Sequence, residues 1–209
     1  MGWFAKKWLK LSESFAVKFS DVVVTDNKAI TDYVQEEYGK SSYTIAYGGD
    51  HALDSEHSNY SNLEVSEDYY FTVCRIEPEN NIEMILKSFA DSKHLIKFVG
   101  NWDASEYGQN LFNTYSKYSN IELVKPIYDI KELYKLRSNC TGYIHGHSAG
   151  GTNPSLVEIM HFGKPVVAYD CSFNRYTTDD KAIYFKDSNQ LTLELDRLGQ
   201  DSKDLVGAS

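Results

Sequence analysis

The sequence predicts an α/β fold: a Rossmann-like parallel sheet with helices on both faces, preceded by a small βαβ-like remnant of a first domain. From residue 69 onward, short apolar runs alternate strictly with longer segments of helical periodicity, a pattern typical of parallel sheets covered by helices. Ahead of it, residues 51–68 are polar and short of large aliphatic side chains. Such composition is typical of a hinge or linker.

An amphipathic helix is predicted at the N-terminus, in the segment WFAKKWLKLSESFAVKF. Its apolar side chains recur at helical spacing, and most of its lysines lie elsewhere; the spaced residues are Phe4, Trp8, Leu11 and Phe15. Two uses of the apolar face stay open. It packs against a neighbouring domain, or it lies on a membrane surface with its aromatic and lysine side chains at the interface.

A βαβ-like unit completes the first fifty residues. Strands are predicted at 21–25 and 43–47, and between them a helix over 28–38, capped by Asp26 and closed by Gly39. Such a unit is too small to be a domain. Residues 1–50 are therefore predicted to be the C-terminal remnant of a first domain, and the chain is expected to begin partway through it.

The main domain is predicted to span residues 69–209. Its strands are expected at 69–74, 95–99, 121–124, 142–145, 165–169 and 182–185, and its helices at 81–91, 104–118, 130–137, 154–162 and 188–198. Ligands of such sheets bind at the carboxyl ends of the strands, near the point where the strand order reverses. The candidate site loops are therefore 75–80, 100–103, 125–128 and 146–152.

Composition excludes several classes of function. The net charge of −9 and pI near 5.1 argue against nucleic acid as a partner. Cysteines 74, 140 and 171 are odd in number and far apart, which fits neither a disulfide framework nor a zinc site and favours a reducing cytoplasm. His145 and His147 share a strand face but lack a third ligand, so no metal site is expected. No dehydrogenase or P-loop glycine motif is present.

The stretch HGHSAGGTNPSLVE predicts a strand end, a glycine turn and a helix start. Gly150 and Gly151 remove side chains from the turn, and Asn153 is a good N-cap ahead of Pro154 at the first helical position. Backbone N–H groups of such a turn suit a diphosphate, and Glu158 suits ribose hydroxyls. The alternative is an ordinary turn and cap, with Glu158 as a solvated helix residue.

Three other loops fall on the same edge of the predicted sheet. Arg75, in CRIEPENN, suits a phosphate, although an ion pair with Glu77 or Glu79 is the alternative. Pro126, Ile127 and Tyr128 are candidates for the nucleobase side, with loop packing as the alternative. Trp102 is a candidate for covering a ligand.

These residues resemble a known family. HGHSAGGTNPSLVEIMHFGKPVVAYD and VCRIEPENN are similar to the donor-binding half of GT-B glycosyltransferases of the large retaining family four. SESFAVKFSDVVVTDN, YVQEEYGKSS and IAYGGDHAL resemble its bacterial polysaccharide rhamnosyltransferase-like branch, where they end the acceptor domain and enter the hinge. The resemblance spans nearly the whole chain, to about Leu198.

The resemblance implies a role for each matching position. Arg75 holds the donor diphosphate, Glu158 binds the ribose and the loop from Pro126 to Tyr128 faces the base. Contacts to phosphate and sugar come from Gly150, Gly151, Thr152 and Asn153, and Asn80 is also expected among the donor-binding residues. Two positions depart from the family: Gly150 stands where many members have a first glutamate, and Asn80 where many have a phosphate-binding lysine. An asparagine in place of that lysine lowers the local positive charge.

The resemblance also implies the reaction. A sugar, with dTDP-L-rhamnose as the leading donor and UDP-sugars behind it, passes to a glycan or lipid-linked acceptor in cell-surface polysaccharide biosynthesis. No metal or other cofactor is expected, and the anomeric configuration is retained. The catalytic residues are expected mainly in the missing acceptor domain, so the chain alone binds donor but transfers poorly. A cytoplasmic location is expected, with peripheral association at the inner membrane surface open. A sugar-nucleotide epimerase and a non-catalytic nucleotide-binding module are the alternatives.

Overall fold

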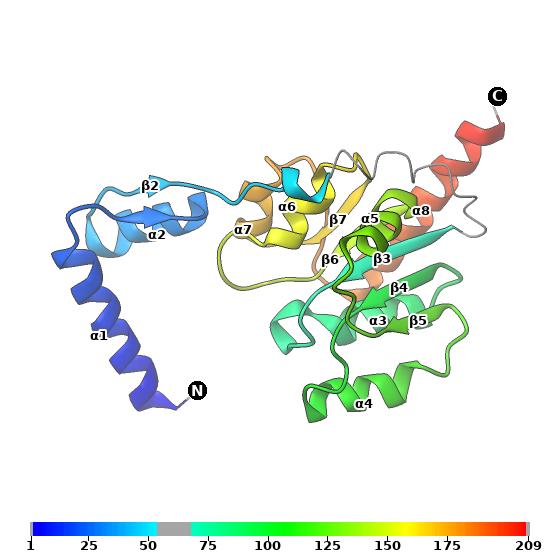
Figure 1. Cartoon of the computed structure of the whole chain (residues 1–209), viewed down its shortest axis with the longest axis horizontal. Coiled ribbons are helices and arrows are strands. Elements are labelled where there is room, and N and C mark those ends of the chain that lie inside the picture. Colours follow the sequence, from blue (N-terminus) through cyan, green and yellow to red (C-terminus); the bar gives the residue numbers. More distant parts are fainter. Residues whose placement is uncertain (1, 54–67, 208–209) are drawn as a thin grey trace.

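The computed structural model describes residues 2–53 and 68–207, and its main body is one parallel sheet (Figure 1). The sheet has six strands in the order β5-β4-β3-β6-β7-β8, and every neighbouring pair is parallel. The strands are β3 (Tyr69–Val73), β4 (Leu95–Val99), β5 (Ile121–Val124), β6 (Gly142–His145), β7 (Val166–Tyr169) and β8 (Ile183–Phe185). The predicted α/β class, with its parallel sheet, is confirmed.

Helices cover both faces of the sheet. They are α3 (Ile82–Ala90), α4 (Glu106–Tyr115), α5 (Ile130–Asn139), α6 (Pro154–Met160), α7 (Ser172–Thr177) and α8 (Ser188–Gly207). One core joins α3, α4 and α8 to side chains such as Tyr70 and Ile96, and the other joins α5 and α6 to Phe71 and Tyr143. Because successive strand residues point to opposite faces, a strand covered on both sides must be apolar throughout. Burial of such side chains drives folding of this sheet.

The N-terminal part forms a smaller unit that packs against the main body. It contains α1 (Trp3–Phe19), β1 (Val24–Thr25), α2 (Lys28–Tyr38), β2 (Tyr43–Thr44) and the 3-10 turn η1 (Asp50–Ala52). The strands β1 and β2 are parallel and form a two-stranded sheet. Helix α2 lies against α7, and η1 lies against α6. Residues 24–53 are therefore in contact with the elements that follow β6 and β7.

Several predicted boundaries need correction. The N-cap of α2 is Asn27 rather than Asp26, because the Asn27 side chain accepts a hydrogen bond from the N–H of Ala29 at 2.9 Å. Helix α4 starts later than predicted, after Ser105, whose hydroxyl caps it. Helix α8 continues to Gly207, and α7 has no counterpart among the predictions. The predicted end of α2 at Gly39, in the left-handed conformation, is confirmed.

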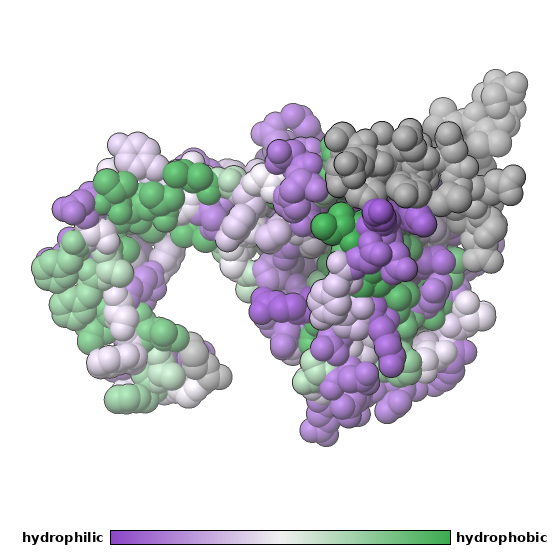
Figure 2. Space-filling view, in the orientation of Figure 1, coloured by the Kyte–Doolittle hydropathy of each residue, from purple (hydrophilic) through white to green (hydrophobic). Residues whose placement is uncertain are grey.

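Helix α1 extends away from the large sheet with most of its apolar side chains exposed (Figures 1 and 2). The largest are Trp3, Phe4, Trp8, Phe15 and Phe19, whereas Val17 is buried. The predicted N-terminal helix is confirmed over Trp3–Phe19. Within the described residues, none of the helices combines the length and the apolar character needed to cross a bilayer.

Candidate functional site

The sheet has its topological switch point between β3 and β6. The chain leaves β3 toward β4 and leaves β6 toward β7, on opposite sides of this central pair. The carboxyl edge of the sheet at this switch point is the ligand position in doubly wound sheets. These loops contain the two stretches that the sequence singles out, Arg75 to Asn80 and Gly146 to Asn153.

The two loops are joined by a dense set of hydrogen bonds. The Asn81 side chain donates to the carbonyl of Gly146 at 2.8 Å, and both the N–H and the hydroxyl of Ser148 donate to the carbonyl of Glu79, at 2.9 and 2.8 Å. Gly146 is required by this contact, since a Cβ there would overlap the Asn80 carbonyl oxygen. These contacts hold the two loops together in a fixed arrangement.

Asn80 belongs to this framework. Its amide nitrogen donates to the Arg75 carbonyl at 2.7 Å, its side-chain oxygen lies 2.7 Å from His147 Nδ1, and the residue is 4% exposed. The structure places the Asn80 side chain between the two loops, where it fixes the backbone that carries Arg75. Asn80 is predicted from the sequence to be a donor contact, but the polar atoms of its side chain are directed at other protein groups.

Arg75 is an exposed cation at this edge of the sheet. Among the described residues, its guanidinium has no hydrogen bond or ion pair, so the alternative pairing with Glu77 or Glu79 is wrong. The positive charge of Arg75 contributes to lowering the pKa of nearby His147, after the larger effect of burial. An unpaired guanidinium beside a rigid loop is available for an anionic ligand.

The glycine loop has the predicted local structure. Gly150 has a φ of 88°, in the left-handed region that favours glycine. The Asn153 side chain caps α6 by accepting from the N–H of Ser155 at 3.1 Å, and Pro154 is the first helical residue. Thr152 is buried, and its hydroxyl donates to the Asp26 carbonyl. The N-terminal unit thereby holds this loop.

Glu158 is paired inside the protein rather than free in solvent. Its carboxylate accepts a hydrogen bond from Arg137 and lies 3.1 Å from His51 Nε2. Arg137 is itself buried at the end of α5, so the pair is shielded from water. This arrangement excludes the solvated-helix alternative. Arg137 and His51 were not predicted, because nothing local in the sequence indicates a contact between residues that are far apart.

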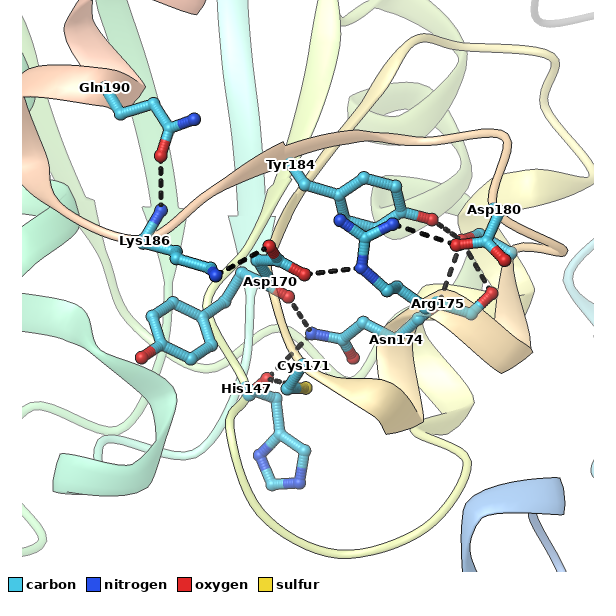
Figure 3. Close-up of polar contacts among 11 residues, drawn as sticks. His147, Asp170, Cys171, Asn174, Arg175, Asp180, Tyr184, Lys186 and Gln190 are labelled. Atoms are coloured by element: carbon cyan, nitrogen blue, oxygen red, sulfur yellow. Dashed lines mark hydrogen bonds and ion pairs between the residues drawn. The ribbon is translucent and has the colours of Figure 1, made fainter.

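Helix α7 supports the glycine loop from the other side (Figure 3). The Asn174 side chain donates to the carbonyls of His147 and Tyr169, both at 2.8 Å. Asp170, at the end of β7, pairs with Arg175 and, at 3.4 Å, with Lys186. The hydrogen bond from Arg175 lowers the pKa of Asp170. This ion-pair cluster anchors α7, and its contacts explain why the short helix forms.

The two aromatic candidates differ. Trp102 is buried at 3% exposure, donates from its indole to the Val124 carbonyl at 3.0 Å and packs against Phe98, so the ligand-covering role is wrong. Tyr128, in contrast, is 87% exposed at the carboxyl end of β5. Ile127 packs against the core on the α5 and α6 side. Within the described residues, no group of three or more His, Cys, Asp or Glu is placed to hold a metal ion.

Acid should destabilise the protein through His145, which is buried and stacks on Tyr143. Burial lowers the pKa of His145 from 6.5 to about 3. Between these pH values the unfolded chain binds a proton that the folded protein does not. The free energy of unfolding is thus expected to fall by about 1.4 kcal/mol per pH unit as the pH drops below 6.5.

Urea unfolding at several pH values would measure this slope in wild type, His145→Phe and the exposed-site control His161→Gln. We expect the slope to become shallower in His145→Phe alone. An equal slope in wild type and His145→Phe would show that other groups cause the acid sensitivity.

The strand order and the loops at the switch point define a doubly wound α/β domain of the kind that binds nucleotides. Comparison with known families then gives the assignment. Residues 54–205 match the family described as glycosyl transferases group 1, so the chain belongs to this family. Residues 3–50 match a domain of unknown function, DUF1972. A search of curated proteins gave no match.

Solved structures share the fold at low sequence identity. A sucrose-phosphate synthase from Thermosynechococcus elongatus aligns with a TM-score of 0.74 and 18% identity, over 91% of this chain and 52% of that one. HepE from Anabaena, in complex with UDP-glucose, aligns with a TM-score of 0.72 and 16% identity, over 93% and 58%. An α,α-trehalose-phosphate synthase (UDP-forming) from Burkholderia vietnamiensis gives 0.66 and 13%, over 88% and 52%. The fold is that of GT-B glycosyltransferases, and the chain spans 52% to 58% of the length of these structures.

Proposed function

We propose that this chain is the donor-binding part of a glycosyltransferase that uses a nucleoside-diphosphate sugar. One observation carries the proposal: the Arg75 guanidinium, which has no partner among the described residues, and the glycine loop lie together at the switch point, on the carboxyl edge of the sheet. An arginine and the backbone N–H groups of a glycine turn are two complementary ways to bind phosphate oxygens. Both also stabilise the charge that develops on a departing nucleoside diphosphate.

Each part of the donor then has its contacts. Arg75, Gly150, Gly151 and Asn153 bind the diphosphate and the adjoining sugar. Thr152 contributes by holding the loop in position, because its hydroxyl already donates a hydrogen bond to the Asp26 carbonyl. Asn80 likewise acts by positioning Arg75 and His147.

The nucleoside lies farther along the same edge. Glu158 accepts hydrogen bonds from the ribose, with Arg137 and His51 holding its carboxylate in place. The loop of Pro126, Ile127 and Tyr128 lies beside the base, where the exposed Tyr128 ring offers a stacking surface. No metal is needed in this scheme, because Arg75 supplies the positive charge.

The finer assignment follows the sequence resemblance. We assign the chain to retaining family four and its rhamnosyltransferase-like branch, with dTDP-L-rhamnose as the donor and a glycan or lipid-linked acceptor of cell-surface polysaccharide assembly. UDP-sugars are the competing donors, since HepE is in complex with UDP-glucose. Residues 1–50 form part of an acceptor domain, 51–68 the hinge and 69–209 the donor domain. The enzyme works in the cytoplasm, at the inner face of the membrane.

Calorimetric titration with dTDP, UDP, GDP and ADP, with and without magnesium, tests this function. We expect selective binding of one nucleotide without metal. Replacement Arg75→Ala should weaken that binding about 10-fold to 100-fold, because a charge-assisted, two-pronged contact is lost. The affinity of Arg75→Lys should lie between those of wild type and Arg75→Ala, since an ammonium group retains the charge but not the two parallel N–H donors of a guanidinium.

The matched control is Arg197→Ala, on the exposed face of α8, where the side chain pairs with Glu194 in the same helix and with no other described residue. It should bind nucleotide as wild type does. Unchanged affinity in Arg75→Ala would remove Arg75 from the site, and absence of binding to all four nucleotides would contradict the proposed function of this chain.

A further inference from the structure

The N-terminal unit places one carboxylate directly on the glycine loop. Asp26 follows β1, and its side chain lies against Gly151, so close that a Cβ at residue 151 would lie 2.5 Å from Asp26 Cγ and overlap both carboxylate oxygens. Gly151 is thus needed less for its backbone conformation, which is not left-handed, than for the room that it leaves. Asp26 and Gly151 thus fit together in space although they lie 125 positions apart in the sequence.

The backbone on either side of this carboxylate is fixed. The Asp26 carbonyl accepts the hydrogen bond from the Thr152 hydroxyl. The buried Asn27 side chain donates to the Thr152 hydroxyl at 3.2 Å, to the Phe173 carbonyl at 3.2 Å and to the Thr177 hydroxyl at 3.1 Å. The position of Asp26 is therefore fixed by hydrogen bonds of its backbone carbonyl and of Asn27, and not by its own carboxylate.

The Asp26 carboxylate itself has no hydrogen bond or ion pair within residues 2–53 and 68–207 of the structure, although it is half-buried. Other acidic side chains at the same interface are occupied. Asp32 accepts from Lys28 and from Tyr176, and Glu158 from Arg137. A half-buried carboxylate that leaves its acceptors unused loses hydration without compensation. A ligand that donates hydrogen bonds would restore them.

The charge of Asp26 selects what that ligand group can be. A carboxylate repels phosphate oxygens at short range and accepts from hydroxyl groups. On the proposed function, the ligand at this loop carries a diphosphate and a sugar, and only the sugar has hydroxyl groups to offer here besides the ribose next to Glu158. We propose that Asp26, from the N-terminal unit, is a specificity-determining contact that accepts hydrogen bonds from hydroxyl groups of the donor sugar.

Paired titrations on the same chain test this inference separately from the proposed function. The probes are dTDP with dTDP-L-rhamnose and UDP with UDP-glucose, against wild type, Asp26→Ala and Asp26→Asn. We expect Asp26→Ala to weaken the sugar nucleotide about tenfold or more and to leave the free diphosphate unchanged or slightly tighter. Asp26→Asn should retain part of the sugar affinity, because its amide oxygen still accepts a hydrogen bond.

A control variant separates the contact from structure. Asp32→Asn removes a carboxylate from the same interface, away from the loop, and should change neither affinity.

The outcomes are distinct. Suppose that wild type binds both the free diphosphate and its sugar nucleotide. If Asp26→Ala then weakens the two affinities equally, or leaves both unchanged, the inference is overturned and the proposed function stands. If wild type binds no nucleotide at all, the proposed function fails first, and the inference with it.

Discussion

Replacement Gly146→Ala is expected to cost about 3 kcal/mol of the free energy of unfolding, the largest effect of any single methyl group considered for this chain. The added Cβ would overlap the Asn80 carbonyl oxygen and approach Ile85 Cδ1 to 2.7 Å. The Asn80 carbonyl belongs to the backbone, so it cannot move away from the new methyl group as the end of an exposed side chain could. The loops would have to part, breaking the hydrogen bond from Asn81 to the Gly146 carbonyl.

Urea unfolding followed by circular dichroism measures this cost. The control is Gly48→Ala, whose new Cβ meets only the side-chain oxygen of the exposed Asp50 at 3.1 Å, and which should change stability by less than about 0.5 kcal/mol. Wild-type stability in Gly146→Ala would mean that the two loops are not in contact as described. We also expect this variant to lose nucleotide binding, since the site rests on the same loops.

Replacement Asn27→Ala is expected to cost about 2 to 4 kcal/mol. It removes the amide group that makes three hydrogen bonds across a buried interface, and it also removes the side-chain cap of α2. Each of these contributions is about 1 kcal/mol. The acceptors left behind on Thr152, Phe173 and Thr177 would stay buried without that partner. The N-terminal unit should then detach at lower urea concentration than the main sheet unfolds.

Asn27→Ser separates the two contributions. Serine caps helices well, but its shorter side chain cannot reach Thr177 or Phe173. If the interface matters most, Asn27→Ser should resemble Asn27→Ala in urea unfolding and in limited proteolysis of residues 24–53. Recovery of wild-type stability in Asn27→Ser would show instead that the cap accounts for the loss.

The main domain was predictable because its signals are local. Strands such as 95–99, 121–124 and 142–145 were predicted with the observed bounds, since each is an apolar run with clear turn residues beside it. The helix α7 was missed because its six residues, SFNRYT, have no apolar stripe. It is held by tertiary contacts, the Asn174 side chain among them, and no window of sequence contains those contacts.

The candidate site divides in the same way. The cap at Asn153, the turn at Gly150 and the place of Arg75 at the end of β3 follow from neighbouring residues and were predicted. The partners of Glu158, the inward direction of Asn80 and the approach of Asp26 depend on residues that only the fold brings together. Trp102 shows the converse error: a residue in a site loop can turn inward when the adjacent core has space for its ring.

The contacts of Asn27 lie 125 to 150 positions away along the chain, and this separation sets the order in which the protein can be built. During synthesis, residues 24–53 leave the ribosome long before α6 and α7 exist. Closing so long a loop is entropically costly and slow. The N-terminal unit therefore docks last, after the six-stranded sheet has formed, and its exposed apolar side chains must be tolerated until then. Mutations at this interface should lower the yield of correctly assembled protein more than they lower the stability of protein that has already matured.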